Sequence, residues 1–141
     1  MKSVVKTTKE ELIQRYESGE RNFVGLDLAG VRLTGMNLSG ADFTGADFTG
    51  AQMNQTNLEG ANLSRAVLVK ADLTDANLTR ANLSQADCSA ALLIRANLTE
   101  AKLQGTILRW ASLAQVTPLS VDLSKTVLQK TILPNGSPLE R

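Results

Sequence analysis

Residues 41–50 read ADFTGADFTG, the same five letters twice, and related fives follow at 61–65 (ANLSR) and 71–75 (ADLTD). Steps of five from Phe23 give 23 successive positions in one phase, and all except Pro118 carry a nonpolar side chain of the expected kind. We call these positions centres. A period of five matches neither an α-helix, with 3.6 residues per turn, nor a continuous strand, with a period of two. The chain is therefore a repeat protein.

Each five-residue unit predicts a short extended segment followed by a corner. The residue two before the centre is small, and it is alanine at every such position from Ala61 to Ala101. The residue between is polar, often asparagine or aspartate. Residues two apart in an extended segment share a face, so the small residue and the centre point inward and the polar residue points outward. Eight of the ten glycines fall at the second corner position, where glycine tolerates the positive φ that some tight turns need. The chain must therefore coil.

The number of units in one coil does not follow from the period. Three units would give a 15-residue coil and four would give a 20-residue coil. A 20-residue coil stacks Asn37, Asn57, Asn77 and Asn97 in an outer ladder, and it pairs Asn62 with Asn82. A 15-residue coil pairs asparagines slightly less well, so the pattern favours the longer coil and leaves the shorter one open.

The repeated pattern A(D/N)LXX resembles that of the bacterial pentapeptide-repeat family. The match covers residues 21–135 without loss of register. The resemblance implies an all-β fold, a right-handed quadrilateral β-helix with 20 residues per coil. On that basis residues 21–135 would form about 5.75 coils, a rod about 28 Å long at roughly 4.8 Å per coil.

The two ends depart from the repeat. Residues 1–20 are expected to form an N-terminal capping segment with a short α-helix at about 9–18, because Thr8 and Glu11 match a capping box. Leu12 then begins a nonpolar pattern at helical spacing, and Gly19 can end the helix. Residues 136–141 are expected to form a flexible C-terminal tail. The last coil would then lack a cap, so we leave open both a monomer and a homodimer through the C-terminal coil.

Composition excludes several classes of partner and compartment. The 141 residues carry a net charge of +1, and residues 21–135 hold nine acidic and ten basic side chains. This balance neither attracts nucleic acid nor imitates it. The start of the chain has no nonpolar core of a secretory signal, and no nonpolar run approaches the roughly 20 residues of a membrane helix. We therefore expect a cytoplasmic protein with no nucleic-acid or membrane partner.

The sequence offers no catalytic constellation. Histidine, the commonest general base near neutral pH, is absent. No metal-binding cluster or phosphate-binding glycine motif occurs. The single cysteine, Cys88, occupies a centre and is interpreted as a core residue that has no disulfide partner in the chain. We expect no catalytic residue, no metal and no cofactor, and hence not an enzyme.

One outer surface differs from the polar remainder. In a 20-residue coil, segments 66–70, 86–90, 106–110 and 126–130 stack, and nonpolar side chains reach outer or corner positions there. The resulting candidate partner-binding face, called the Trp110 surface below, consists of Val67, Val69, Lys70, Ile107, Arg109, Trp110, Val127 and Lys130. The next face adds Leu92, Ile94 and Ile132. A nonpolar patch with a basic rim is typical of a protein-binding site. The alternative is structural: valine and isoleucine suit strands, and Trp110 folds over Leu119 beside a bulge at Pro118.

These observations favour a non-enzymatic protein-binding or scaffold module that uses its β-helix faces to bind an unidentified protein. The resemblance also raises a second function, because some members of the family protect DNA gyrase with acidic faces shaped like duplex DNA. The near-neutral charge of residues 21–135 speaks against such a DNA mimic, whether inhibitor or protector.

Overall fold

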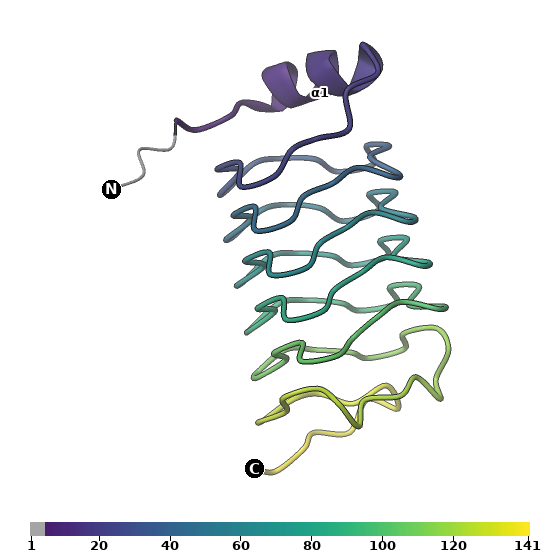
Figure 1. Cartoon of the computed structure of the whole chain (residues 1–141). Coiled ribbons are helices and arrows are strands. Elements are labelled where there is room, and N and C mark those ends of the chain that lie inside the picture. The colour runs from purple at the N-terminus through teal and green to yellow at the C-terminus, as the bar shows by residue number, and fades with distance from the viewer. Residues whose placement is uncertain (1–4) are drawn as a thin grey trace.

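The computed structural model describes residues 5–141 and shows a stack of coils (Figure 1). The helix α1, Lys9–Glu17, lies across one end of the stack, and the C-terminus lies at the other end. The extended segments are so short that each contributes a single bridging residue rather than a longer strand. The chain therefore turns after each short extended segment, as the five-residue period predicts.

Parallel bridges set the length of a coil. Asn37 bridges to Asn57, Asn57 to Asn77, and Asn77 to Asn97, and Asn62 bridges to Asn82. Every step is 20 residues, so the 20-residue coil is confirmed and the 15-residue alternative is wrong. The figure of 5.75 coils stays a prediction.

The inward positions form a continuous core. Ala61 and Leu63 are exposed by 1% and 0%, and the same alternation repeats through the central coils. Near the N-terminal end the core is aromatic: the ring centroids of Phe23 and Phe43 lie 5.4 Å apart, and those of Phe43 and Phe48 lie 5.1 Å apart. Each fully buried leucine or phenylalanine contributes roughly 1.5–3 kcal/mol of hydrophobic free energy.

The outward asparagines and aspartates have a structural function beyond solubility. The Asn62 Oδ1 accepts a hydrogen bond of 2.9 Å from the backbone N–H of Ser64, and the Asp72 Oδ1 accepts one of 3.0 Å from that of Thr74. A short side chain that ends in a carbonyl or carboxylate reaches the backbone N–H two residues later well, whereas a serine hydroxyl makes this contact more weakly, as Ser112 does with Ala114 at 3.4 Å. This geometry explains why the repeat prefers Asn or Asp to other polar residues.

The second corner residue adopts positive φ whichever amino acid occupies it. The angle is 68° at Gly45, 58° at Arg65 and 61° at Gln115. This left-handed conformation costs a residue with a Cβ atom about 1–2 kcal/mol, and glycine avoids the cost. The first coils use glycine at these corners, whereas most later corners carry larger residues and bear the strain.

Helix α1 covers the N-terminal end of the core. Its capping residue is Thr8, whose hydroxyl accepts a 3.1 Å hydrogen bond from the Glu11 N–H, as the predicted capping box requires. Leu12, on the side of the helix that faces the core, is fully buried. The helix ends at Glu17 rather than 18, because Ser18 is the C-cap and Gly19 follows with φ of 102°.

A short segment before the helix extends one face of the stack. Lys6 bridges to Asp27 in parallel, and the Thr7 N–H donates a 2.9 Å hydrogen bond to the Asp27 carbonyl. The Lys6 ammonium also lies 3.9 Å from the Asp27 carboxylate. This part of the first coil therefore has its edge paired, which protects it from pairing with other chains.

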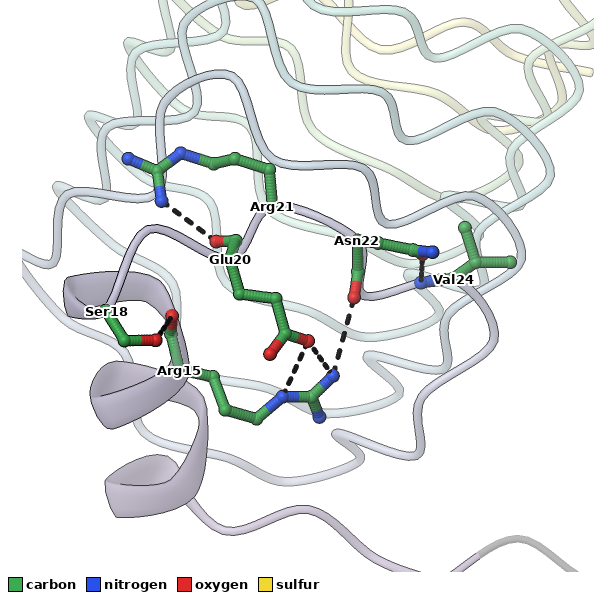
Figure 2. Close-up of polar contacts among 6 residues, drawn as sticks. All are labelled: Arg15, Ser18, Glu20, Arg21, Asn22 and Val24. Atoms are coloured by element: carbon green, nitrogen blue, oxygen red, sulfur yellow. Dashed lines mark hydrogen bonds and ion pairs between the residues drawn. The ribbon is translucent and has the colours of Figure 1, made fainter.

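Polar contacts join α1 to the first coil (Figure 2). The Arg15 Nε donates to Glu20 at 2.8 Å, and the same guanidinium reaches the Asn22 carbonyl at 3.4 Å. The Arg21 guanidinium lies 3.6 Å from the centre of the Tyr16 ring. The hydrogen bond from Arg15 lowers the pKa of Glu20, and the hydrogen bond to Glu20 raises the pKa of Arg15. These contacts hold the helix in one orientation.

The ladder is interrupted near Pro118, as predicted. Among the described residues Lys102 has no bridge to Asp122, and the Gly105 N–H donates to Lys125 at 2.7 Å, one residue beyond the regular register. In a regular coil the N–H of a centre donates to the coil that follows, as Leu98 does. Pro118 occupies a centre but has no N–H, so it cannot donate this hydrogen bond to a following coil.

The C-terminal residues differ from the expected flexible tail. They fold back on the last coil, where Ile132 and Pro138 form an antiparallel bridge. The Leu139 N–H donates to Thr131 at 2.7 Å, and the Lys130 N–H donates to Arg141 at 2.8 Å. The turn at residues 134–136 reverses the chain, and the returning residues give the exposed edge of the last coil partners for its backbone groups.

Candidate functional site

The structure brings the outer residues of the Trp110 surface onto one ladder. Val67 bridges to Asp87, Asp87 to Ile107, and Ile107 to Val127. The three nonpolar side chains therefore lie on one face, and Asp87 separates Val67 from Ile107. This is the stacking on which the sequence prediction depended, and it follows directly from the 20-residue coil.

The corner residues of the surface form a column beside this ladder. The Lys70 N–H donates to Ser89, the Ala90 N–H to Arg109, and the Trp110 N–H to Gln129, at 2.9, 2.8 and 2.7 Å. Each bond links one coil to the next, so Lys70, Ala90, Trp110 and Lys130 follow one another along a single edge of the rod. Ala90 is half-buried, although the residues at the other three positions are exposed.

Trp110 is the most exposed nonpolar side chain of the Trp110 surface. It is 57% exposed, whereas Val67, Val69, Ile107 and Val127 are half-buried. Its backbone has φ of 59°, so a bulky side chain occupies a corner of the kind at which the first coils use glycine. A single exposed nonpolar side chain is common on protein surfaces, but one that lies beside other nonpolar side chains forms a patch of the kind that marks contact with a partner.

The geometry gives little support to the alternative in which Trp110 folds over Leu119. Leu119 follows Thr117, which belongs to the Asn97 ladder, whereas Trp110 follows Ile107 on a different ladder. Leu119 is 68% exposed and Trp110 is 57% exposed, which is not the burial expected if one covered the other. Of the neighbouring face, Leu92 is 42% exposed, and Ile94 and Ile132 are half-buried.

Pattern reasoning did not identify a groove beside Pro118. The groove has a volume of about 400 Å³. Its nonpolar lining comes from Leu98, Ala101, Leu103, Pro118 and Val121. The signal in the sequence was Pro118 itself, but the extent of the opening depends on how far the last coil separates from the one before it.

Cys88 is a core residue in this structure. Its side chain is fully buried, and burial raises the pKa of the thiol to about 12, with a smaller contribution from Asp87. A thiol is a nucleophile only as the thiolate, which this environment suppresses near neutral pH. The described residues hold no group of three or more His, Cys, Asp or Glu side chains that could bind a metal ion.

No helix between residues 5 and 141 has the length and nonpolar character needed to cross a membrane. The location of the protein within a cell stays a prediction from composition.

The chain is similar to two solved structures from cyanobacteria. One is HetL, a pentapeptide-repeat protein involved in heterocyst differentiation regulation in Nostoc sp. strain PCC 7120; it is 29% identical, with a TM-score of 0.62. The match covers 90% of this chain but only 60% of HetL. The other is Rfr23, a pentapeptide-repeat protein from Cyanothece 51142, also 29% identical, with a TM-score of 0.71 and coverage of 84% of this chain and 90% of Rfr23.

A search among curated proteins gives no match. A family model for pentapeptide repeats matches in eight copies, over residues 22–60, 46–85 and 81–117. Together these ranges cover more than half of the chain, and their five-residue period is the one that the bridges display. Members of that family fold as right-handed quadrilateral β-helices, and this chain belongs to the pentapeptide-repeat family.

Proposed function

We propose that the protein is a non-catalytic binding module that captures another protein through the Trp110 surface. The observation that carries this proposal is the 57% exposure of Trp110 at a corner flanked by half-buried nonpolar side chains. Tryptophan is enriched among the residues that dominate binding energy in protein interfaces, where it lies in a nonpolar centre with a polar rim. Here Val67, Ile107 and Val127 supply the nonpolar middle of the surface. The cations Lys70, Arg109 and Lys130 supply its polar rim.

The β-helix provides a rigid platform for such a surface. The column of backbone hydrogen bonds beneath Lys70, Ala90 and Trp110 fixes their spacing before any partner arrives. A preformed surface loses little conformational entropy on binding. This rigidity is the physical reason to expect a binding or scaffold function from a fold with no catalytic group.

The DNA-mimic alternative has less support. The ladder from Asn37 to Asn97 carries no charge at its outward positions, and the ladder of the Trp110 surface mixes Asp87 with nonpolar residues. A mimic of duplex DNA needs a continuous row of negative charges.

A second copy of the chain, docking on the C-terminal coil, is the other partner that the sequence raised. Leu123 and Leu128 are half-buried at that end. Within residues 5–141 the tail pairs with Ile132, and no bridge pairs the edge around Leu123. A homodimer through this end stays a prediction, to be tested by analytical ultracentrifugation.

Affinity capture from native lysate tests the proposed function. The wild type is compared with Trp110→Glu and with Leu119→Glu, a matched control because Leu119 is also exposed but lies on a different ladder. We expect the wild type and Leu119→Glu to retain the same protein and Trp110→Glu to lose it, with unchanged circular dichroism and melting temperature. Equal capture by all three would contradict the proposal.

A second variant covers the case in which Trp110→Glu fails to fold. Trp110→Gly relieves the positive φ of 59° at this corner, so it should fold at least as stably as the wild type. It should nevertheless lose the partner. If Trp110→Gly unfolds the protein, Trp110 is structural and the proposal fails.

A further inference from the structure

Three cations, Lys70, Arg109 and Lys130, lie on the Trp110 surface, and none of them has an acidic side chain as a partner among the described residues; Arg32, Arg65, Lys102 and Lys125 are also unpaired there. The ion pairs among the described residues are Lys6–Asp27, Arg15–Glu20, Arg80–Glu59 and Arg95–Asp75. Two of these pairs, those of Arg80 and Arg95, join neighbouring coils at corners. Lys70, Arg109 and Lys130 form no such pair within residues 5–141, and the only side-chain hydrogen bond of Lys130 goes to the backbone carbonyl of Glu140 at 2.8 Å.

Charge is also distributed unevenly along the rod. Residues 21–60 contain four acidic and two basic side chains, whereas residues 101–135 contain one acidic and four basic side chains. The near-neutral total therefore conceals a basic C-terminal third. Because mobile ions screen charges over about 8 Å at physiological salt, this local excess matters for a partner in contact more than for long-range attraction.

From these two observations we propose that the partner of the Trp110 surface is an acidic protein segment. It places a nonpolar side chain against Trp110 and its carboxylates against Lys70, Arg109 and Lys130. This inference rests on the proposed function and adds the chemistry of the partner. Complementary charge at the rim contributes mainly specificity and the rate of association, while the desolvated nonpolar contact contributes most of the affinity.

The geometry favours a protein over a nucleic acid or a membrane. Asp87 lies within the ladder between Val67 and Ile107 and repels any negative charge placed over it. A protein segment can keep its carboxylates at the rim, beside the three cations, whereas the evenly spaced charges of a phosphate backbone cannot avoid Asp87. Three cations are also fewer than the six to ten phosphate contacts of a typical DNA-binding protein. The nonpolar side chains other than Trp110 are half-buried in a flat ladder, so they cannot insert into a bilayer.

Zero-length cross-linking with a carbodiimide tests the inference. The reagent joins a carboxylate to a lysine amine only when the two are in contact, so captured partner should become coupled to Lys70 or Lys130 through an aspartate or glutamate. Any product between Lys130 and a carboxylate of the same chain is identified from the protein alone and subtracted. The coupled peptides are located by mass spectrometry.

Three pairs of substitutions supply the controls. Lys70→Arg with Lys130→Arg keeps the charge but removes the amines, so capture should persist and coupling should disappear. Lys70→Glu with Lys130→Glu should lose capture at physiological salt. Lys102→Glu with Lys125→Glu, at the same end of the rod but outside the Trp110 surface, should behave as the wild type.

The outcomes separate this inference from the function on which it rests. If no protein is retained in a Trp110-dependent manner, the proposed function fails and the inference fails with it. If retention depends on Trp110 but survives charge reversal and gives no coupling to Lys70 or Lys130, the inference alone is overturned. Retention that nuclease treatment abolishes, or binding to phosphatidylserine vesicles in place of protein, also overturns it.

Discussion

At the N-terminal end the centres Phe23 and Phe43 are fully buried beneath α1, whereas at the C-terminal end the centres Leu123 and Leu128 are half-buried. The same five-residue unit builds both ends. The difference lies in what covers them: a helix with Leu12 inserted into the core at one end, and a short returning tail at the other. In a solenoid each coil is stabilised by its neighbours. A centre therefore contributes its full free energy only when a coil or a cap lies on both sides.

The largest expected effect comes from truncating centres at the two ends. Phe43→Ala should lower the free energy of unfolding by about 3–5 kcal/mol, because it removes a fully buried ring and leaves a cavity. Leu123→Ala should cost only about 1 kcal/mol, since that side chain is half-buried. Urea titration followed by circular dichroism measures both. Equal losses would mean that the last coil is as tightly packed as the first.

Removal of residues 137–141 should have an intermediate effect. The antiparallel pairing with Ile132 would be lost, and the free energy of unfolding should fall by about 1–2 kcal/mol. The newly exposed edge should also increase self-association, which sedimentation velocity would detect as a concentration-dependent shift. A truncated chain that keeps both its stability and its sedimentation behaviour would show that the tail does not protect this end.

Corners provide a smaller and opposite pair of effects. Gly45→Ala should destabilise by about 1 kcal/mol, because alanine bears the strain of positive φ even though no atom obstructs its Cβ. Gln115→Gly, in the C-terminal half, relieves the same strain and should be neutral or slightly stabilising. Thermal melts of the two variants measure the difference. If both substitutions shift the melting temperature in the same direction, side-chain contacts rather than φ determine the stability of these corners.

The smallest effect is a pH dependence at the N-terminal end. Hydrogen bonding from Arg15 lowers the pKa of Glu20 in the folded state, so the pair stabilises the fold above the ordinary glutamate pKa of about 4.3. That stability is lost as the pH falls through the lowered pKa. Glu20→Gln should therefore flatten the decline in melting temperature below about pH 4.3.

Asp122→Asn is the counterpart at the other end. Hydrogen bonds from the Ser124 hydroxyl and backbone N–H lower the pKa of Asp122. The sign of the expected change is therefore the same as for Glu20→Gln. If only one of the two substitutions changes how the melting temperature falls with decreasing pH, the end that carries it controls the first step of acid unfolding.

The sequence predicted the repeat because the spacing of centres and alanines is local and needs no knowledge of distant contacts. The asparagine pattern also favoured a 20-residue coil, which the bridge between Asn37 and Asn57 confirms. The stacking of Val67, Ile107 and Val127 followed from that coil by arithmetic. That this surface binds a partner stays a prediction.

Features that depend on three-dimensional contacts were not predictable in the same way. The hydrogen bond from Ser64 to Asn62 explains the Asn/Asp preference, but the pattern alone showed only an outward polar residue. The ion pair between Arg15 and Glu20 depends on how the helix turns into the first coil. The pairing of Pro138 with Ile132 depends on a chain reversal that composition does not reveal.

All three prolines of the protein, Pro118, Pro134 and Pro138, lie in the last coil or its tail. A rod of stacked coils pairs its backbone in parallel from one layer to the next, as a cross-β fibril does, and an unpaired end is a template for another layer. Pro118 removes the N–H that such a layer would need, and Pro138 occupies the neighbouring edge. We therefore expect the protein to remain dispersed at concentrations at which a proline-free version, continued in the same five-residue period, would seed fibres.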